Sequence, residues 1–351
     1  MAVSRQRVAI LLGGRSGEHE VSLRSARSVM NALDPGRWEA VPIGITRQGH
    51  WLSSAETASA LASGATALPA GGLPLLQASG ALADLASCAI ALPLVHGTYG
   101  EDGTLQGLLE MTDLPYAGCG VAASAIGMDK ALMKALFREA GIPVARYGVI
   151  RAWDYTPEHF DVSYVDQAAG FPCFVKPANG GSSVGVTKVR SREDLDGALA
   201  AAFAYDDKAV IEEAIPGQEV ECSVLGNERP EASIVGEIVP DRDFYDYASK
   251  YADDSKAGLL IPARLEKGTA ATVRDLALRM YQVMGCEGYA RVDFFVSPSG
   301  RVVANEINTI PGFTSISMYP KLWEASGLVY RDLVTRILDL GFDRHARRSA
   351  R

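Results

Sequence analysis

Short apolar runs alternate with helical patterns over the first third of the chain. Such runs, about four to eight residues long and bounded by turn residues, are typical of strands buried on both faces. They predict strands at residues 7–12, 39–45 and 88–95. Val21, Val29 and Leu33 then recur at helical spacing, and the alanine-, glycine- and serine-rich stretch 53–87 indicates helix fragments joined by loop. Strands alternating with helices predict a parallel α/β domain over the first 120 residues.

The pattern changes at residue 129. Residues 129–141 (DKALMKALFREAG) have helical spacing and end at a glycine, with a proline just beyond. A second helix is predicted at 192–203, where Leu195, Leu199 and Phe203 recur every four residues. Strands are predicted beside these helices at 145–150, 172–178 and 208–215. The middle of the chain therefore reads as a compact α+β unit.

The last third combines strands, helices and a basic end. Strands are predicted at 219–226, 289–296 and 301–308. The last two are joined by SPSG, whose proline and glycine suit a tight turn. A long helix is predicted through Val273, Leu276, Met280 and Val283, and two closing helices at about 317–326 and 329–340. The final residues, RHARRSAR, are expected to be a frayed terminus.

Composition narrows the class of protein. A chain of 351 residues is expected to form two or three domains. The 34 lysines and arginines against 42 acids give a net charge of −8, which argues against nucleic acid as the main partner. The five cysteines are widely spaced without a C-x-x-C pair, which favours buried free thiols in a reducing cytosol. The short apolar run near the N-terminus predicts a first strand, so a soluble cytoplasmic protein without a membrane span is expected.

The predicted hairpin carries the sharpest chemical signal. Because side chains alternate along a strand, Arg291 and Asp293 share a face with Phe295, and Glu306 shares a face with Asn308. The turn is expected to set Arg291 roughly opposite Glu306. The opposite face is expected to be buried through Val292, Phe294, Val296, Val303 and Ile307. A solvated face with an ordinary salt bridge would give the same pattern.

The loop that follows the hairpin favours a metal–phosphate site. NTIPGFTS is rich in glycine and hydroxyl groups and comes directly after the carboxylates. Mg²⁺ binds through a few hard oxygen ligands together with substrate phosphates. The sequence therefore favours a metal–phosphate site over a salt-bridged surface.

Other charged motifs are less specific when taken singly. KPANGGSSVGV (176–186) resembles a phosphate-holding loop with Lys176 at its base, although glycine–serine loops are often only turns. His96 follows a buried strand, where α/β folds place ligand groups. Lys130 in MDK and the glutamates of EEAIPGQE could be ordinary surface charges. The glutamates of GGRSGEHE could merely favour the positive end of the next helix.

Taken in order, these blocks resemble the D-alanine–D-alanine ligase family of the ATP-grasp superfamily. The resemblance rests on LLGGRSGEHEVSLRSA, HGTYGEDGTLQG, LPYAGCGVAASAIGMDK, GIPVARY, FPCFVKPANGGSSVGV, FYDYASKY, GYARVDFFV and NEINTIPGFTSISMYPKL. It implies a mixed α/β, multi-domain chain with the ATP-grasp fold and an N-terminal parallel α/β domain. The expected parts are 1–120, with the first D-alanine site; 121–212, the central subdomain; 213–345, with a lid loop and metal site; and 346–351, a basic tail.

The resemblance also implies roles for individual residues. For ATP it implies phosphate contacts from Lys130, Lys176 and Lys250, an adenine hinge from Glu212 and Glu213 to Ile215, a ribose contact from Glu219, and further contacts from Ser182, Ser183, Asn305 and Glu306. For metal it implies two Mg²⁺ or Mn²⁺ ions on Asp293, Glu306 and Asn308.

Substrate contacts follow in the same way. Glu18 would hold the ammonium of the first D-alanine, with His96 near its carboxylate. Arg291 and the backbone at Gly312 would stabilise the oxyanion, while Ser317, next to Met318, would bind the second D-alanine. Glu18, Ser182 and Tyr251 would form a hydrogen-bonded bridge that closes a lid over the site.

The activity implied is ATP-dependent synthesis of D-alanyl-D-alanine for peptidoglycan precursors through an acyl phosphate. The lid sequence YDYASKY favours D-alanine over D-lactate as second substrate. A homodimer is expected, and a monovalent cation requirement is left open. Rival readings are a depsipeptide ligase, an ATP-grasp ligase for other amino acids, and a nucleotide-binding protein without turnover.

Overall fold

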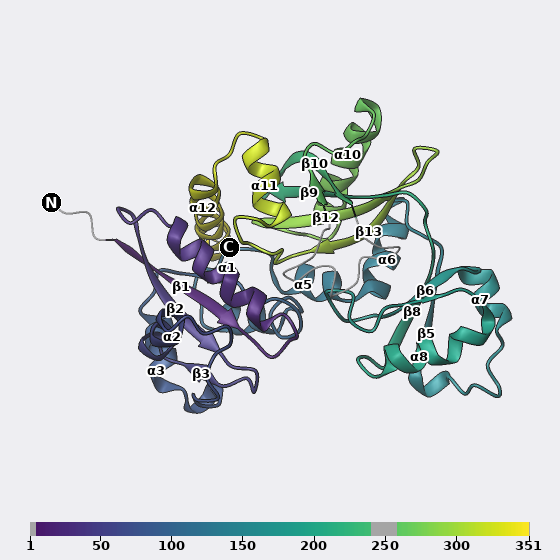
Figure 1. Cartoon of the computed structure of the whole chain (residues 1–351). Helices are drawn as coiled ribbons and strands as arrows, with labels where there is room; N and C mark the ends of the chain where they lie inside the picture. Colours follow the sequence, from purple (N-terminus) through teal and green to yellow (C-terminus); the bar gives the residue numbers. More distant parts are fainter. Residues whose placement is uncertain (1–4, 240–257, 351) are drawn as a thin grey trace.

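The computed structural model describes residues 5–239 and 258–350. They form three sheets, which Figure 1 shows with the first sheet at one end, the second at the other and the third between them. Short 3₁₀ turns lie at Leu75–Gln77, Ala152–Asp154 and Arg192–Asp194. None of the helices in this part of the chain combines the length and apolar character needed to cross a membrane.

The first sheet has the order β3-β2-β1-β4. Its strands are β1 (Gln6–Gly13), β2 (Trp38–Ile45), β3 (Trp51–Leu52) and β4 (Ile90–Pro93). β1 is parallel to β2 and β4, as the strand–helix alternation predicted, whereas the short edge strand β3 is antiparallel and was not predicted. The helices of this part are α1 (His19–Ala32), α2 (Ser54–Ala62), α3 (Ser79–Ala86) and α4 (Thr104–Met111).

The second sheet is antiparallel throughout, in the order β5-β8-β6-β7. Its strands are β5 (Tyr147–Arg151), β6 (Cys173–Pro177), β7 (Thr187–Val189) and β8 (Lys208–Glu213), with helices α7 (Ser163–Ala168) and α8 (Leu195–Phe203). The loop between β6 and β7 is the predicted glycine-rich loop. The α+β character of this unit is confirmed.

The third sheet has five antiparallel strands in the order β11-β10-β9-β12-β13. They are β9 (Gln218–Leu225), β10 (Glu231–Val239), β11 (Gly258–Leu260), β12 (Tyr289–Val296) and β13 (Val302–Asn308). The helices are α5 (Val121–Met128), α6 (Lys130–Glu139), α10 (Lys267–Val283), α11 (Met318–Ala325) and α12 (Tyr330–Ser349). β10 and β11 were not predicted from the sequence.

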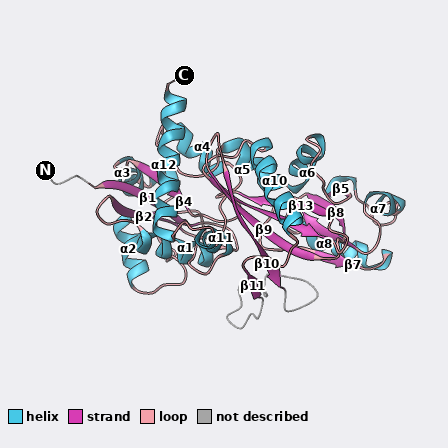
Figure 2. Cartoon of the chain, turned by 90° about the horizontal axis from the view of Figure 1, so that it is seen from above, coloured by secondary structure: helices cyan, strands magenta, loops and turns pink. Residues whose placement is uncertain are grey.

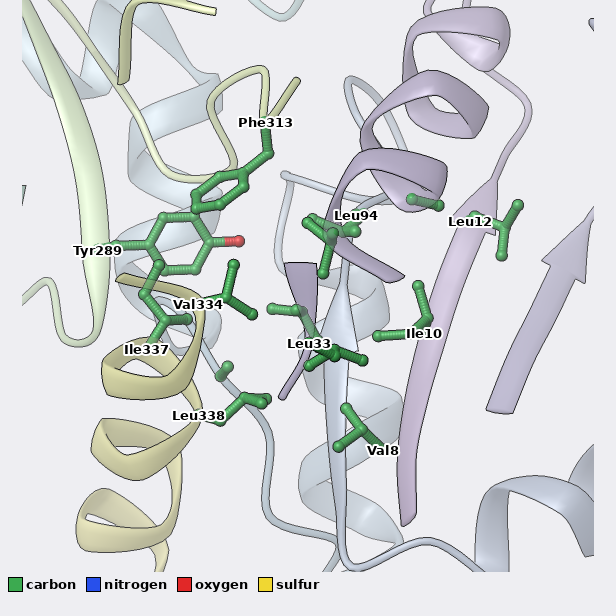
Figure 3. Close-up of a cluster of buried hydrophobic side chains, with 14 of the residues drawn as sticks. Val8, Ile10, Leu12, Leu33, Leu94, Tyr289, Phe313, Val334, Ile337 and Leu338 are labelled. Carbon is green, nitrogen blue, oxygen red and sulfur yellow. The ribbon is translucent and has the colours of Figure 1, made fainter. Parts of the chain in front are cut away.

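Two hydrophobic cores pack the first and third sheets and their helices. One joins β1, α1 and β4 to Tyr289, Phe313 and α12, and Figure 3 shows Val334, Ile337 and Leu338 of α12 facing the side chains of the first sheet. The other packs α5 and α6 against β9, β12 and α10. Because apolar burial is the main driving force of folding, the first and third sheets are bound firmly across α12, seen from above in Figure 2.

The hairpin register differs from the expected one. Asp293, not Arg291, lies opposite Glu306, and Arg291 lies opposite Asn308. Two shifts cause the difference: Val296 pairs with Val302 rather than with Arg301, and a β-bulge makes Asn305 an extra residue between the pairs Phe294–Ala304 and Asp293–Glu306. All five residues predicted for the buried face are buried, but the bulge places Val302 and Ala304, rather than Val303, in the same hydrophobic cluster as Ile307.

The expectation of a frayed basic terminus is wrong. α12 continues to Ser349, and Arg344 on it is buried. Its guanidinium donates to the carbonyl oxygens of Gly118 and Tyr116 and stacks on the Tyr116 ring at 3.9 Å. Arg347 and Arg348 pair with the acids Glu110, Glu228 and Glu287. The basic residues therefore join the first and third sheets rather than lying free in solvent.

Candidate active site

The hairpin β12–β13 carries a buried cluster of charge. Arg291 donates from Nε to Asp293 Oδ1 at 2.8 Å and from Nη2 to Asp293 Oδ2 at 2.7 Å, a two-point pairing. Its Nε also lies 3.1 Å from Glu221 Oε2 on the neighbouring strand β9. Burial lowers the pKa of Arg291, but Asp293 and Glu221 raise it by more, so the guanidinium keeps its charge.

The oxygen donors of this hairpin fit a divalent cation. Asp293 faces Glu306 across the strand pair, and Asn308 follows on β13 with its side-chain oxygen accepting from the amide of Ile310 at 3.0 Å. Two carboxylates and an amide oxygen are the hard ligands that Mg²⁺ prefers. Within residues 5–239 and 258–350, the histidine, cysteine, aspartate and glutamate side chains form no group of three or more that could bind a metal ion by themselves. A cation here would therefore complete its shell with Asn308 and with oxygen atoms of phosphate or water.

Lys130 connects this hairpin to the glycine-rich loop. It is the first residue of α6, which begins here because the Asp129 side chain accepts from the amides of Ala131 and Leu132. Lys130 Nζ donates to the carbonyl oxygen of Gly180 at 2.5 Å and lies 3.9 Å from Glu306 Oε2. The ammonium thus stands between the loop expected to hold phosphate and a carboxylate expected to hold metal.

Glu212 lies between two lysines. Its Oε2 is 3.1 Å from Lys176 Nζ and its Oε1 is 3.1 Å from Lys134 Nζ. Burial raises the pKa of Glu212, but the two ammonium groups outweigh it and lower the pKa to about 2. Both carboxylate oxygens are therefore engaged, and the expected adenine-hinge role of Glu212 is joined by a structural one, the orientation of Lys176.

Sequence reasoning did not find Lys134. The lysine lies on the buried face of α6 with Ala131, Met133 and Phe137. Burial lowers its pKa, and the Glu212 carboxylate opposes this effect. A lysine within the apolar stripe of a helix was the available signal, because lysine is almost never fully buried unless it is paired.

The other predicted nucleotide residues are spread along β8 and β9. Glu213 turns away from Lys176 and pairs with Arg146, with its Oε1 3.6 Å from Arg301 Nη1. Ile215 is half-buried in the connection from β8 to β9, and Glu219 lies near the start of β9, opposite Phe295.

The glycine-rich loop reaches the first sheet through Ser182. Ser182 and Ser183 both have left-handed backbone angles, with φ of 52° and 59°, which turn the chain sharply. Ser182 Oγ donates to Glu18 Oε1 at 2.5 Å. A side chain at Gly181 would put its Cβ 3.0 Å from Glu18 Oε2, so a larger residue there would have to displace the carboxylate. Two of the three members of the expected bridge are thus in contact.

Glu18 lies at the start of α1, beside His96. Ser16 accepts from the amide of Glu18 at 3.2 Å and donates to the carbonyl oxygen of His96 at 2.6 Å. His96 Nδ1 donates to the carbonyl oxygen of Ile310 at 2.8 Å, and its Nε2 lies 3.0 Å from Ser25 Oγ. Both ring nitrogens therefore contact protein groups.

Glu101 also belongs to this group and was missed from the sequence. Its Oε1 lies 3.5 Å from His96 Nδ1. Burial raises the pKa of Glu101, and Glu18 adds to the rise against the opposing effect of His96. Burial lowers the pKa of His96, but Glu101 and Glu18 raise it by more. The glutamate follows the histidine by five residues in HGTYGE, a spacing that gave no periodic signal.

The loop after β13 carries the remaining predicted residues. Ser317 precedes α11 and shares hydrogen bonds with Thr314, at 3.1 Å to its amide and 2.8 Å to its hydroxyl. A Cβ added at Gly312 would lie 3.2 Å from Ser317 Oγ, so these two positions are neighbours. Met318 is buried with Ile238 and Leu322. Lys250 and Tyr251 lie outside the described residues.

Comparison with known proteins decides the family. Residues 7–119 match the family profile described as D-ala D-ala ligase N-terminus, and residues 136–339 match the one described as D-ala D-ala ligase C-terminus. The chain belongs to the D-alanine–D-alanine ligase family. The mixed α/β architecture is accordingly the ATP-grasp fold, as the sequence predicted.

Relatives of this family match the chain nearly end to end. The D-alanine–D-alanine ligase of Geobacillus thermodenitrificans is 45% identical, over 97% of this chain and 96% of the relative. That of Halothermothrix orenii is 46% identical, over 97% and 99%. Among solved structures, the D-alanine–D-alanine ligase of Coxiella burnetii has a TM-score of 0.83 at 36% identity, over 99% and 97% of the two chains. The VanG D-Ala:D-Ser ligase of Enterococcus faecalis has a TM-score of 0.81 at 32% identity, over 96% and 100%.

Proposed function

We propose that this chain is an ATP-dependent D-alanine–D-alanine ligase that supplies a dipeptide for peptidoglycan precursors. The observation that carries the proposal is a charged cluster of Arg291, Asp293 and Glu306, with Lys130 beside Glu306. It occurs in a chain that matches relatives of this activity over nearly its whole length. Such a ligase also requires ATP, in addition to the two D-alanine molecules.

The chemistry explains why these charges are needed. A carboxylate is a poor acyl donor, because its charge repels an amine and oxide is not a usable leaving group. Transfer of the γ-phosphoryl group to a carboxylate oxygen of the first D-alanine gives an acyl phosphate, whose leaving group is phosphate. Attack by the amine of the second D-alanine then forms the peptide bond and releases phosphate, with ADP as the other product.

Each step draws on particular side chains. Phosphoryl transfer between anions is helped by fixed positive charge, which Lys130 and Lys176 provide at the glycine-rich loop. Mg²⁺ or Mn²⁺ on Asp293, Glu306 and Asn308 would neutralise phosphate charge. Arg291 is held by Asp293 and Glu221 close to the same surface, where it would stabilise the oxyanion of the tetrahedral intermediate.

The substrate contacts belong to the same proposal. Glu18, oriented by Ser16 and Ser182, would hold the first ammonium, beside His96. Gly312 and Ser317 are neighbours, which supports an oxyanion contact next to a carboxylate contact. The bridge through Tyr251, the phosphate contact of Lys250 and the contact of Met318 are proposed on family resemblance.

Family resemblance also supports the remaining parts of the proposal. These are a homodimer in the cytoplasm and a division into parts at about residues 120, 212 and 345, while a monovalent cation requirement stays open. Residues 121–139 belong to the expected central subdomain (121–212), but their helices α5 and α6 pack on β9 and β12 of the third sheet.

Product analysis tests the proposal. The enzyme is incubated with ATP, Mg²⁺ and D-alanine, alone or with excess D-serine or D-lactate, and product masses are compared. D-Ala–D-Ala as the main product in every mixture is expected. A D-Ala–D-Ser or depsipeptide product would reassign the second substrate, and phosphate release without any dipeptide would contradict ligase activity. L-alanine serves as the inactive control.

A further inference from the structure

The chain bends at residue 310, and the turn formed by residues 310–313 is held by side chains of the N-terminal part of the chain. Here the Ile310 carbonyl oxygen accepts from His96 Nδ1 at 2.8 Å, and the Phe313 amide donates to Ser25 Oγ at 3.2 Å. The two backbone groups on either side of Gly312 are thus bonded to a side chain of the loop after β4 and to a side chain of α1.

Ser25 joins these two contacts. Its Oγ lies 3.0 Å from His96 Nε2, and Ser25 is fully buried on α1. A carbonyl oxygen can only accept, so His96 carries a proton on Nδ1, and in the neutral ring Nε2 accepts from the Ser25 hydroxyl. The Ser25 oxygen then has a lone pair for the Phe313 amide. Each donor in the chain from Ile310 through His96 and Ser25 to Phe313 has an acceptor.

The turn presents one remaining backbone donor. Pro311 has no N–H and the Phe313 amide is used by Ser25, which leaves the amide of Gly312. Ser25 also lies on the helix that begins beside Glu18, seven residues earlier and therefore about two turns away on a similar face. One rigid element thus carries both the residue proposed for the first ammonium and the residue that holds the turn of the proposed oxyanion contact.

We propose that Ser25 is a positioning residue for acyl transfer. Its hydroxyl links His96 to the Phe313 amide and thereby fixes the Gly312 amide relative to Glu18. The proposal rests on the ligase activity proposed above, and Ser25 acts through the turn rather than by touching substrate. Loss of the hydroxyl leaves the Phe313 amide without its partner and lets the turn move away from the oxyanion.

Ser22 offers a matched control. It is fully buried on α1 like Ser25, but its hydroxyl accepts from the Gly13 amide at 2.7 Å and donates to the Leu94 carbonyl oxygen at 2.6 Å. Gly13 ends β1 and Leu94 directly follows β4, so neither contact involves the 310–313 turn. Ser22→Ala and Ser25→Ala each remove one buried hydroxyl from the same helix. The two variants are expected to lose stability to a similar degree, so a difference in catalysis reports the link to the turn.

The experiment compares steady-state kinetics and stoichiometry. Ser25→Ala is expected to lower kcat by about 10-fold or more and to raise the half-saturating concentration of the second D-alanine, with the KM for ATP changed by less than about twofold. Slower attack by the amine gives water more time to hydrolyse the acyl phosphate, so phosphate released per dipeptide should rise above one. Ser22→Ala is expected to keep kcat within about twofold and the ratio at one.

The outcomes separate the two proposals. If wild type forms no dipeptide, the proposed function fails. If wild type is active but Ser25→Ala matches Ser22→Ala in kcat and in phosphate per dipeptide, only the positioning role is overturned. Should Ser25→Ala not fold, Ser25→Cys fills similar space with a weaker acceptor. A folded Ser25→Cys with wild-type kcat and stoichiometry would equally overturn the proposal.

Discussion

Lys134 Nζ lies 3.1 Å from Glu212 Oε1, and both side chains are almost completely buried. The other oxygen of the same carboxylate lies 3.1 Å from Lys176 Nζ. One carboxylate between two ammonium groups leaves a net positive charge at the base of the glycine-rich loop. Lys134 therefore lets Lys176 be held by Glu212 without cancelling the positive charge offered to phosphate.

Replacement of Lys134 by methionine tests this arrangement. Removal of one partner of a buried ion pair costs several kcal/mol. Because Glu212 would still be paired with Lys176, the expected loss in the free energy of unfolding is at the low end, about 3 kcal/mol. ATP affinity should fall as well, because Lys176 is then neutralised by Glu212. Urea unfolding and ATP titration measure the two effects. Lys267→Met, at an exposed position on α10, should change stability by less than about 0.5 kcal/mol. Equal behaviour of the two variants would contradict the account.

Glu212 also predicts a dependence of stability on pH. Its pKa in the folded chain is about 2, below the ordinary 4.5, so the ionised carboxylate contributes stability above pH 4.5 that is lost as the pH falls toward 2. The contribution is about 3 kcal/mol. The difference in unfolding free energy between wild type and Glu212→Gln should therefore shrink on going from about pH 5 to about pH 3. A difference that stays constant over this range would show that the carboxylate is not stabilised by the lysines.

Arg344 is expected to bind the last helix to the rest of the molecule. Arg344→Met would leave the carbonyl oxygens of Gly118 and Tyr116 without their donor, at a cost of about 3 kcal/mol in the free energy of unfolding. Thermal or urea unfolding measures the loss. Arg331→Met, on an exposed position of the same helix, should stay within about 0.5 kcal/mol of wild type. If Arg344→Met left the free energy of unfolding unchanged, the contacts of Arg344 at the end of α12 would not stabilise the fold.

Arg291→Lys separates charge from geometry. Lysine keeps the positive charge but loses the planar fork that pairs with Asp293, so the charge no longer has a fixed position beside the oxyanion. We expect kcat to fall by about 100-fold while the dissociation constant of ATP changes by less than about threefold. Pre-steady-state phosphate release and equilibrium ATP binding measure these quantities. Unchanged turnover would remove Arg291 from the acyl-transfer step.

Local patterns predicted most of the fold. Periodicity located β1, β2, β12 and the helices α1, α6 and α10, because the buried faces of each are marked by the spacing of apolar residues in its own sequence. It missed β10 and mistook the end of α12 for a frayed tail. Arg344 is stabilised by carbonyl groups more than two hundred residues earlier, and no local pattern encodes such a contact.

In the candidate site, too, local patterns identified some residues, whereas others depended on contacts between distant segments. Arg291, Asp293 and Glu306 were found because they alternate along strands, but their register depended on the bulge at Asn305. Lys134 was missed because its partner Glu212 lies on another element, and Glu101 was missed because its pairing with His96 depends on how their shared loop folds. A single sequence shows which residues bear charge, whereas their pairing across elements requires the fold.

The central claim is that the first D-alanine is activated as an acyl phosphate. The most direct measurement uses D-alanine labelled with ¹⁸O in its carboxylate, together with ATP and Mg²⁺, and follows the label by mass spectrometry of the released phosphate. One ¹⁸O atom transferred to phosphate for each dipeptide is the predicted result. Phosphate that contains no ¹⁸O while D-Ala–D-Ala accumulates would contradict the account.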